Sequence, residues 1–136
     1  MSAKHTPTLD EEWSEYWTEG EKYLRLVNLP QRPKWFTHEI IYNVAGMAIE
    51  KLAMGFLMHK QELPEGHTLL DLLTALQDFI NFPPSVIEEV KYMESFQKIC
   101  AFGDGYERKP PNEEEWRRMQ LTTNDVAHRL EVALAA

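Results

Sequence analysis

Four polar or small residues in one apolar stretch, Glu39, Asn43, Gly46 and Glu50, could form the floor of a ligand-binding groove. Their separations of four, three and four residues would put them on a single face of a helix. Asn43 and Glu50 would then offer an amide and a carboxylate, and Gly46 would let a ligand or a neighbouring helix approach the backbone closely. The same spacing is typical of the solvent-facing side of an ordinary helix, so both interpretations stay open.

His67 and Asp71 are a histidine and a carboxylate four residues apart at an expected helix start, a spacing that metal sites use. Thr68 lies between them as a candidate N-cap, and Asp71 is then needed as the partner of Thr68 in a capping box. The sequence contains no Glu-x-x-His motif of the kind found in di-iron bundles. We therefore expect no metal site and no cofactor.

Metal-independent cleavage of RNA needs a group that activates the ribose hydroxyl and a cation that stabilises the charge on the phosphate. Arg32 and His38 are the only arginine and histidine in that order with five residues between them. Pro33 lies between them and the pair straddles a loop and a helix start, so chance explains it better than catalysis. Cys100 falls on the apolar side of its expected helix and is interpreted as a small core residue. The sequence therefore favours a protein that is not an enzyme.

The elements that would position these side chains are helices. Residues 35–60 are apolar around most of their circumference and are expected to form a long, buried, central helix. Residues 8–27 carry an aromatic stripe with Trp13 and Trp17, which would pack on the long helix or reach a dimer surface. Three further helices are expected: one from Thr68 to about Ile80, one after Ser85 as N-cap, and one after Thr122 or Thr123 as N-cap.

These patterns predict an all-α fold: an antiparallel bundle of four to five helices, with residues 8–136 as one domain after a flexible N-terminus of residues 1–7. The formal net charge of −8 opposes general binding to nucleic acid, so RNA is a disfavoured ligand. The single cysteine excludes a disulfide framework within the chain, and the first residues show no apolar signal segment. We therefore expect a cytoplasmic protein without a membrane span.

The long helix and the turn after it resemble the HEPN domain, the higher eukaryotes and prokaryotes nucleotide-binding domain. Residues 48–60, AIEKLAMGFLMHK, match the A-x-E-K core of that family through Ala48, Glu50, Lys51 and Leu52. Residues 66–73, GHTLLDLL, match its T-H-x-L segment more loosely, through His67, Leu69 and Leu70. A late loop with Tyr106, Arg108 and Pro110 is similar to the Arg-Tyr-Pro loop of the family, and the likeness covers about residues 9–135.

The resemblance implies a HEPN-like bundle with a groove, and a homodimer. One branch of the family consists of ribonucleases, often toxins of toxin–antitoxin pairs, with an arginine and a histidine a few residues apart near the last helices; this chain lacks that motif there. The other branch pairs with small nucleotidyltransferases or binds nucleotide-like ligands without cleaving RNA. We therefore expect a non-catalytic binding module that holds a nucleotide-type ligand or a partner protein such as a small nucleotidyltransferase.

The candidate ligand-binding residues lie on the groove, the turn and the late loop: Asn43, Glu50, His67, Tyr106 and Arg108. Tyr106 would stack on a base and Arg108 would pair with a phosphate, although a plain surface loop explains both residues equally well.

Two alternatives remain open. The first is a divergent ribonuclease in which Arg108 or Arg118 acts with His67 or His128. The second is a purely structural oligomerisation domain in which the aromatic stripe of the first helix forms the interface. The distance between the arginines and the histidines in the folded chain separates the first alternative from the binding module.

Overall fold

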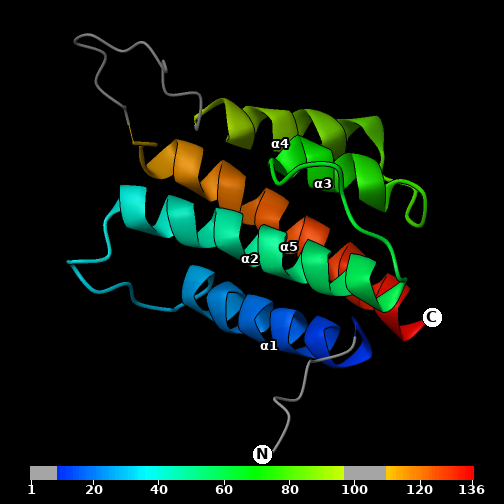
Figure 1. Cartoon of the computed structure of the whole chain (residues 1–136). Coiled ribbons are helices and arrows are strands. Elements are labelled where there is room, and N and C mark those ends of the chain that lie inside the picture. The colour runs from blue at the N-terminus through cyan, green and yellow to red at the C-terminus, as the bar shows by residue number, and fades with distance from the viewer. Residues whose placement is uncertain (1–8, 97–109) are drawn as a thin grey trace, which may run out of the picture.

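A computed structural model of the chain describes residues 9–96 and 110–136 (Figure 1). These residues form five helices and no strand, which confirms the predicted all-α class. The helices are α1 (Leu9–Val27), α2 (His38–His59), α3 (Leu69–Leu76), α4 (Pro84–Ser95) and α5 (Glu113–Ala135).

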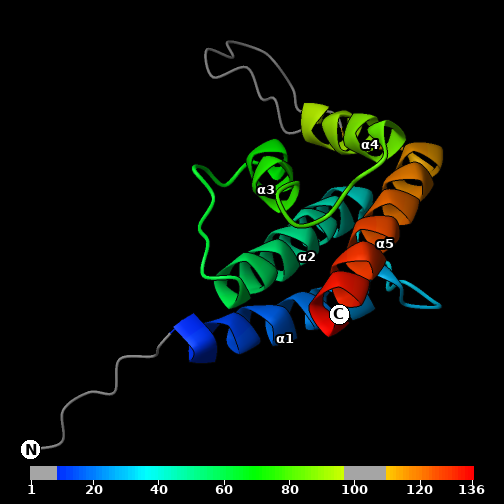
Figure 2. The ribbon, with the colours of Figure 1, turned by 90° about the vertical axis from the view of Figure 1, so that its right-hand side faces the viewer.

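Helix α2 lies in the middle of the bundle, with α1 on one side and α3, α4 and α5 on the other (Figures 1 and 2). Its N-cap is Thr37, whose hydroxyl accepts a hydrogen bond from the Ile40 amide. Every residue from Leu52 to Met58 is buried, as expected for a helix that is apolar on all sides. Among the described helices, α2 alone is long and apolar enough to cross a membrane by composition, but 67% of that window is buried inside the bundle.

Helices α1 and α2 form a close antiparallel pair, and a glycine stands at two of the points where they come nearest. A Cβ on Gly20 would lie 2.7 Å from the Leu52 side chain, and a Cβ on Gly55 would lie 2.9 Å from the carbonyl oxygen of Trp13. Trp13 and Trp17 are half-buried and pack against the core of the bundle. Packing on the long helix, one of the two predicted roles of these tryptophans, is therefore observed, while the dimer surface stays a prediction.

The helices of the bundle do not all run antiparallel to the helices that they contact. Helices α2 and α5 run in the same direction because their first residues meet: the Nε2 atom of His38 lies 2.6 Å from Oε2 of Glu113 (Figure 1). Helices α4 and α5 run in opposite directions, since Glu89 pairs with Arg118 and Tyr92 with Glu115. The predicted antiparallel arrangement is thus not confirmed for the bundle as a whole.

Polar contacts fasten helix α4 to its neighbours. The buried Tyr42 hydroxyl of α2 donates a 2.6 Å hydrogen bond to the Met93 carbonyl. The Arg118 guanidinium donates two hydrogen bonds to Glu89, at 2.7 and 2.9 Å, and lies 3.6 Å from the centre of the Tyr92 ring. The hydrogen bonds from Arg118 hold the pKa of Glu89 below its ordinary value, because they stabilise the ionised carboxylate.

The predicted start of α3 is confirmed, whereas the starts of α4 and α5 were predicted wrongly. The capping box between Thr68 and Asp71 is present. Helix α4 begins at Pro84, because a proline at the first position lacks only an amide that the helix leaves unpaired. Helix α5 begins nine residues before Thr122, after a capping box that Asn112 forms with Glu115.

Thr122 and Thr123 are therefore not N-caps but buried residues inside α5. Their hydroxyls donate hydrogen bonds to the carbonyls one turn earlier, to Arg118 and Met119, at 3.2 and 2.8 Å. A threonine can satisfy its hydroxyl in this way within a helix as well as at its start. Helix α3 also ends at Leu76, earlier than the predicted end near Ile80.

Substitution of Gly55 by alanine tests the contact between α1 and α2. Alanine at an exposed helical glycine stabilises a protein by up to about 1 kcal/mol. Here the added methyl group would meet the backbone of Trp13 and Trp17, which cannot move aside as a flexible side chain can. We expect Gly55→Ala to lower the free energy of unfolding by about 1–3 kcal/mol in urea titrations. The exposed control Thr18→Ala should leave it nearly unchanged, and an unchanged or raised stability of Gly55→Ala would contradict the close contact.

Candidate ligand-binding cavity

A cavity of about 300 Å³ lies between α2 and the start of α3, and it brings together three predicted ligand-binding residues. Asn43 and Glu50 line it from α2, and His67 lines it from the segment before α3. The remaining lining residues are Gly46, Met47 and Leu69. Glu39, the fourth member of the polar line on α2, is exposed and does not line the cavity.

The segment before α3 is held in place by local contacts that fix the position of His67. The chain leaves α2 through Gln61, which has a φ of 60°, and the amide of Glu62 bonds the Leu57 carbonyl at 2.8 Å. The Thr68 hydroxyl then accepts a hydrogen bond from the Asp71 amide at 3.0 Å. Because the carboxylate of Asp71 lies against Gly66, any side chain at position 66 would collide with this capping box.

The cavity offers hydrogen-bonding groups of three kinds. Asn43 supplies a carboxamide, Glu50 a carboxylate and His67 an imidazole. Glu50 is half-buried, and its carboxylate makes no hydrogen bond or ion pair with another described residue. Lys51, next to it in the sequence, pairs instead with Glu19 of α1 at 3.4 Å and lies 4.8 Å from the centre of the Tyr16 ring. The negative charge of Glu50 is therefore not neutralised by Lys51.

The other predicted residues are distributed as follows. Tyr106 and Arg108, and also Cys100, lie outside the described residues. Asp71 is used in the capping box, and the described segments contain no group of three or more potential metal ligands. His67 lines the cavity and forms no part of a metal-binding cluster in these segments.

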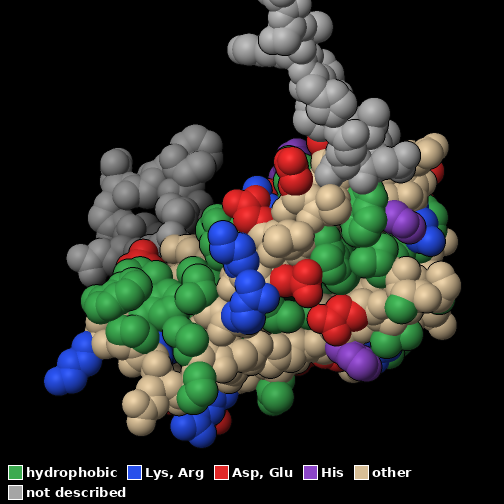
Figure 3. Space-filling view, turned by 90° about the horizontal axis from the view of Figure 1, so that it is seen from below, with side chains coloured by type: hydrophobic (Ala, Val, Ile, Leu, Met, Phe, Trp, Pro, Cys, Tyr) green, Lys and Arg blue, Asp and Glu red, His purple; other side chains and the backbone are tan. Residues whose placement is uncertain are grey.

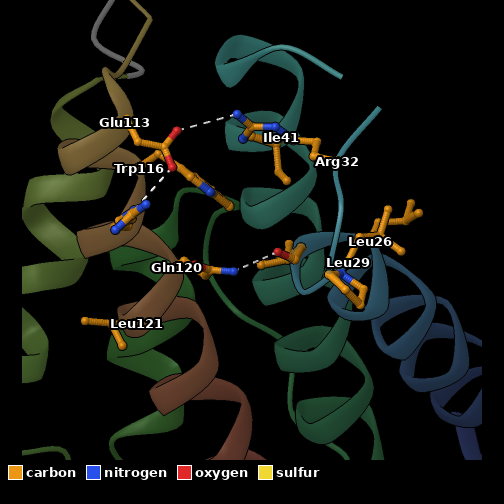
Figure 4. Close-up of a pocket in the computed structure, with 11 residues that line it drawn as sticks. Leu26, Leu29, Arg32, Ile41, Glu113, Trp116, Gln120 and Leu121 are labelled. Carbon is orange, nitrogen blue, oxygen red and sulfur yellow. Dashed lines mark hydrogen bonds and ion pairs between the residues drawn. The ribbon is translucent and has the colours of Figure 1, made fainter. Parts of the chain in front are cut away.

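A larger recess of about 580 Å³ lies between the end of α1, the loop after it and α5, with Ile41 of α2 also lining it (Figure 4). This recess was not expected from the sequence. Most of its lining is apolar, and its polar lining residues are Arg32, Glu113, Arg117 and Gln120. The Asn112-x-x-Glu115 pattern was the signal that could have shown that α5 begins early enough to line it.

Glu113 is the centre of the polar group at this recess. Its carboxylate is 2.6 Å from His38, 3.2 Å from Arg117 and 3.6 Å from Arg32. The hydrogen bond with His38, followed by the hydrogen bond from Arg117, holds the pKa of Glu113 below its ordinary value. Arg32 and His38, the pair that the sequence analysis ascribed to chance, do come together, but both contact Glu113. This geometry favours a structural role, in which Glu113 at the start of α5 holds His38 at the start of α2 and Arg32 in the preceding loop.

The arginines and histidines named for a ribonuclease are placed apart in the described segments. Arg118 is bound to Glu89, His67 lines the cavity on α2, and His128 lines a third hollow beside Arg129. Arg129 itself donates a hydrogen bond to Asp125 at 3.0 Å. No described contact joins Arg118 to either histidine, so the geometry offers this alternative no support from these three residues.

Comparison with protein-family models, with curated proteins and with solved structures found no match for the chain.

The ion pairs of Glu113 predict a pH dependence of stability. A carboxylate whose pKa is lower in the folded than in the unfolded chain stabilises the fold above the unfolded pKa. That contribution is lost as the pH falls from about the ordinary value of 4.5 through the folded pKa. We therefore expect the stability difference between the wild type and Glu113→Gln to shrink as the pH falls through this range.

Urea titrations between neutral and acidic pH measure this difference. The control is Glu114→Gln, which changes an exposed neighbour in the same helical turn. A stability difference for Glu113→Gln that stays constant with pH, or that Glu114→Gln reproduces, would contradict the assignment.

Proposed function

We propose that this protein is a non-catalytic, HEPN-like helical binding module, and that the cavity between α2 and α3 holds the base of a nucleotide-type ligand. The observation that supports the proposal is the convergence of Asn43, Glu50 and His67 on one cavity. These residues come from two separate segments of the chain.

The chemistry of the three side chains suits a nucleobase edge. A carboxylate accepts hydrogen bonds from exocyclic amino groups, and a carboxamide can pair with adenine through a donor and an acceptor at once. The imidazole of His67 adds a donor or an acceptor according to its tautomer. Because the carboxylate of Glu50 is unpaired among the described residues, a ligand that donates to it would satisfy a half-buried charge.

The size and charge of the cavity indicate which part of a nucleotide would enter. A volume of about 300 Å³ is at the lower end of the range for ligand sites, so it suits a base better than a whole nucleotide. Glu50 and the net charge of −8 repel phosphate, so the phosphate would lie outside. The base of the ligand therefore binds against α2, and its phosphate lies near solvent.

The wider features of the proposal rest on the resemblance to the HEPN domain. They are a homodimer, a cytoplasmic location and, as the alternative occupant, a partner protein such as a small nucleotidyltransferase. The resemblance supports them through the A-x-E-K segment with Glu50 and Lys51 and the segment with His67, and these segments meet at the cavity. A cavity that binds no nucleotide would leave the partner protein as the ligand of the module.

Calorimetric titration with the four nucleoside monophosphates tests the base site. We expect AMP, CMP and GMP to bind more tightly than UMP, because uracil alone lacks an exocyclic amino group for Glu50. Glu50→Gln keeps the shape of the side chain but removes the charge and one acceptor. We expect it to weaken binding of the amino-bearing nucleotides about tenfold, with little effect on folding.

The matched control is Glu39→Gln, because Glu39 lies on the same line of α2 but outside the cavity. Glu39→Gln should bind as the wild type does. If none of the four nucleotides binds at millimolar concentration, the nucleotide site is wrong. If Glu39→Gln and Glu50→Gln weaken binding equally, the loss of negative charge in general explains the effect, and the proposed base site is wrong.

A further inference from the structure

The recess between α1, the following loop and α5 is a second place at which this protein can bind something, and its chemistry differs from that of the cavity on α2. Seven of its eleven lining residues are apolar, namely Leu26, Val27, Leu29, Pro30, Ile41, Trp116 and Leu121. Val27, Ile41 and Trp116 are almost fully buried, whereas Leu26 and Leu29 are each 39% exposed. An apolar floor with partly exposed leucines on the wall is typical of a binding groove.

The exposed hydrophobic surface extends beyond the recess. Leu121 on α5 is 73% exposed, and it also lines the neighbouring hollow between α4 and α5. In the loop between α1 and α2, Trp35 is 72% exposed and stacks on the buried Phe36. Figure 3 shows hydrophobic side chains gathered at the end of the molecule where α1 ends, with Lys and Arg side chains bordering them. Exposed apolar side chains grouped in this way mark interaction surfaces.

The charge of the recess is opposite to that of the whole protein. The chain carries a net charge of −8, but the recess is lined by two arginines, Arg32 and Arg117, and by one carboxylate, Glu113. Arg117 has a 73% exposed side chain, and its hydrogen bond to Glu113 uses the Nε donor. The remaining guanidinium donors can therefore reach a carboxylate on an incoming partner.

Contacts between the walls keep the recess open before anything binds. The ion pair between Arg32 and Glu113 spans one end, and Gln120 donates a 3.0 Å hydrogen bond to the Val27 carbonyl at the other (Figure 4). Asn28 and Asn124 exchange two hydrogen bonds, at 2.8 and 2.9 Å, between the end of α1 and α5. A groove held by its own contacts loses little entropy on binding.

We propose that this groove docks an acidic amphipathic helix of a partner protein. Leucine-type side chains of that helix lie on Leu26 and Leu29, and its carboxylates pair with Arg117 and Arg32. The groove is bordered by α5 along one wall, and helices that bind in grooves use anchors spaced three and four residues apart. The excess of positive charge in an otherwise acidic protein selects an acidic partner.

A fluorescently labelled, end-blocked helical peptide tests the proposal, with leucine at positions i, i+3, i+4 and i+7 and glutamate on the remaining faces. Fluorescence anisotropy of this peptide with the full chain should show saturable binding that weakens with salt. Arg117→Glu places a repelling charge on the groove and should weaken binding about tenfold at low salt. Leu29→Asp should weaken it as well, because it disrupts the apolar wall. Circular dichroism confirms that each variant is folded.

Matched controls separate the groove from general attraction. Lys91→Glu reverses an exposed charge on α4, away from the groove, and should bind the acidic peptide almost as the wild type does. A peptide with alanine in place of leucine should not bind. The proposal is overturned if the acidic peptide shows no saturable binding up to about 1 mM. It is also overturned if Lys91→Glu weakens binding as much as Arg117→Glu, or if the wild type self-associates through this face and Arg117→Glu dissociates it.

Discussion

The close approach of α1 to α2 is the constraint on which the rest of the structure depends. Gly20 and Gly55 leave no room for even a methyl group at their contacts, so α1 covers one side of α2 along much of its length. The other side of α2 is then covered by α3, α4 and α5, and the helix is buried from Leu52 to Met58. The stretch around Asn43, Met47 and Glu50 keeps partial access to solvent, and this is where the smaller cavity lies.

Both concave sites arise where a covering helix ends or begins. Helix α3 has only eight residues, and its capped start leaves His67 facing the polar edge of α2. On the opposite side, the chain leaves α1 at Val27, and the loop before α2 stays apart from α5. Ion pairs and amide contacts bridge that gap without filling it. The two sites therefore share the central helix but differ in charge and polarity.

Much of this arrangement could be predicted from the sequence. The 3.6-residue periodicity predicted the all-α class and the central helix, and the spacing of Asn43 and Glu50 placed both residues on one face. The HEPN resemblance added His67, which lines the same cavity. The parallel direction of α2 and α5 could not be predicted, because it depends on a long-range contact between His38 and Glu113. The recess was missed because the last helix was predicted to start after Thr122 or Thr123, although Asn112 and Glu115 form a capping box well before these residues.

The central claim is that the edge of α2 at Asn43 and Glu50, together with His67, forms a base-binding site. The most direct measurement is a ¹H–¹⁵N correlation spectrum of the labelled protein during titration with AMP. If this site binds the base, the amide chemical shifts change mainly in residues 43–50 and 66–70, and these changes saturate together. Shifts that stay unchanged, or that change mainly in the recess around Glu113 and Gln120, would contradict it.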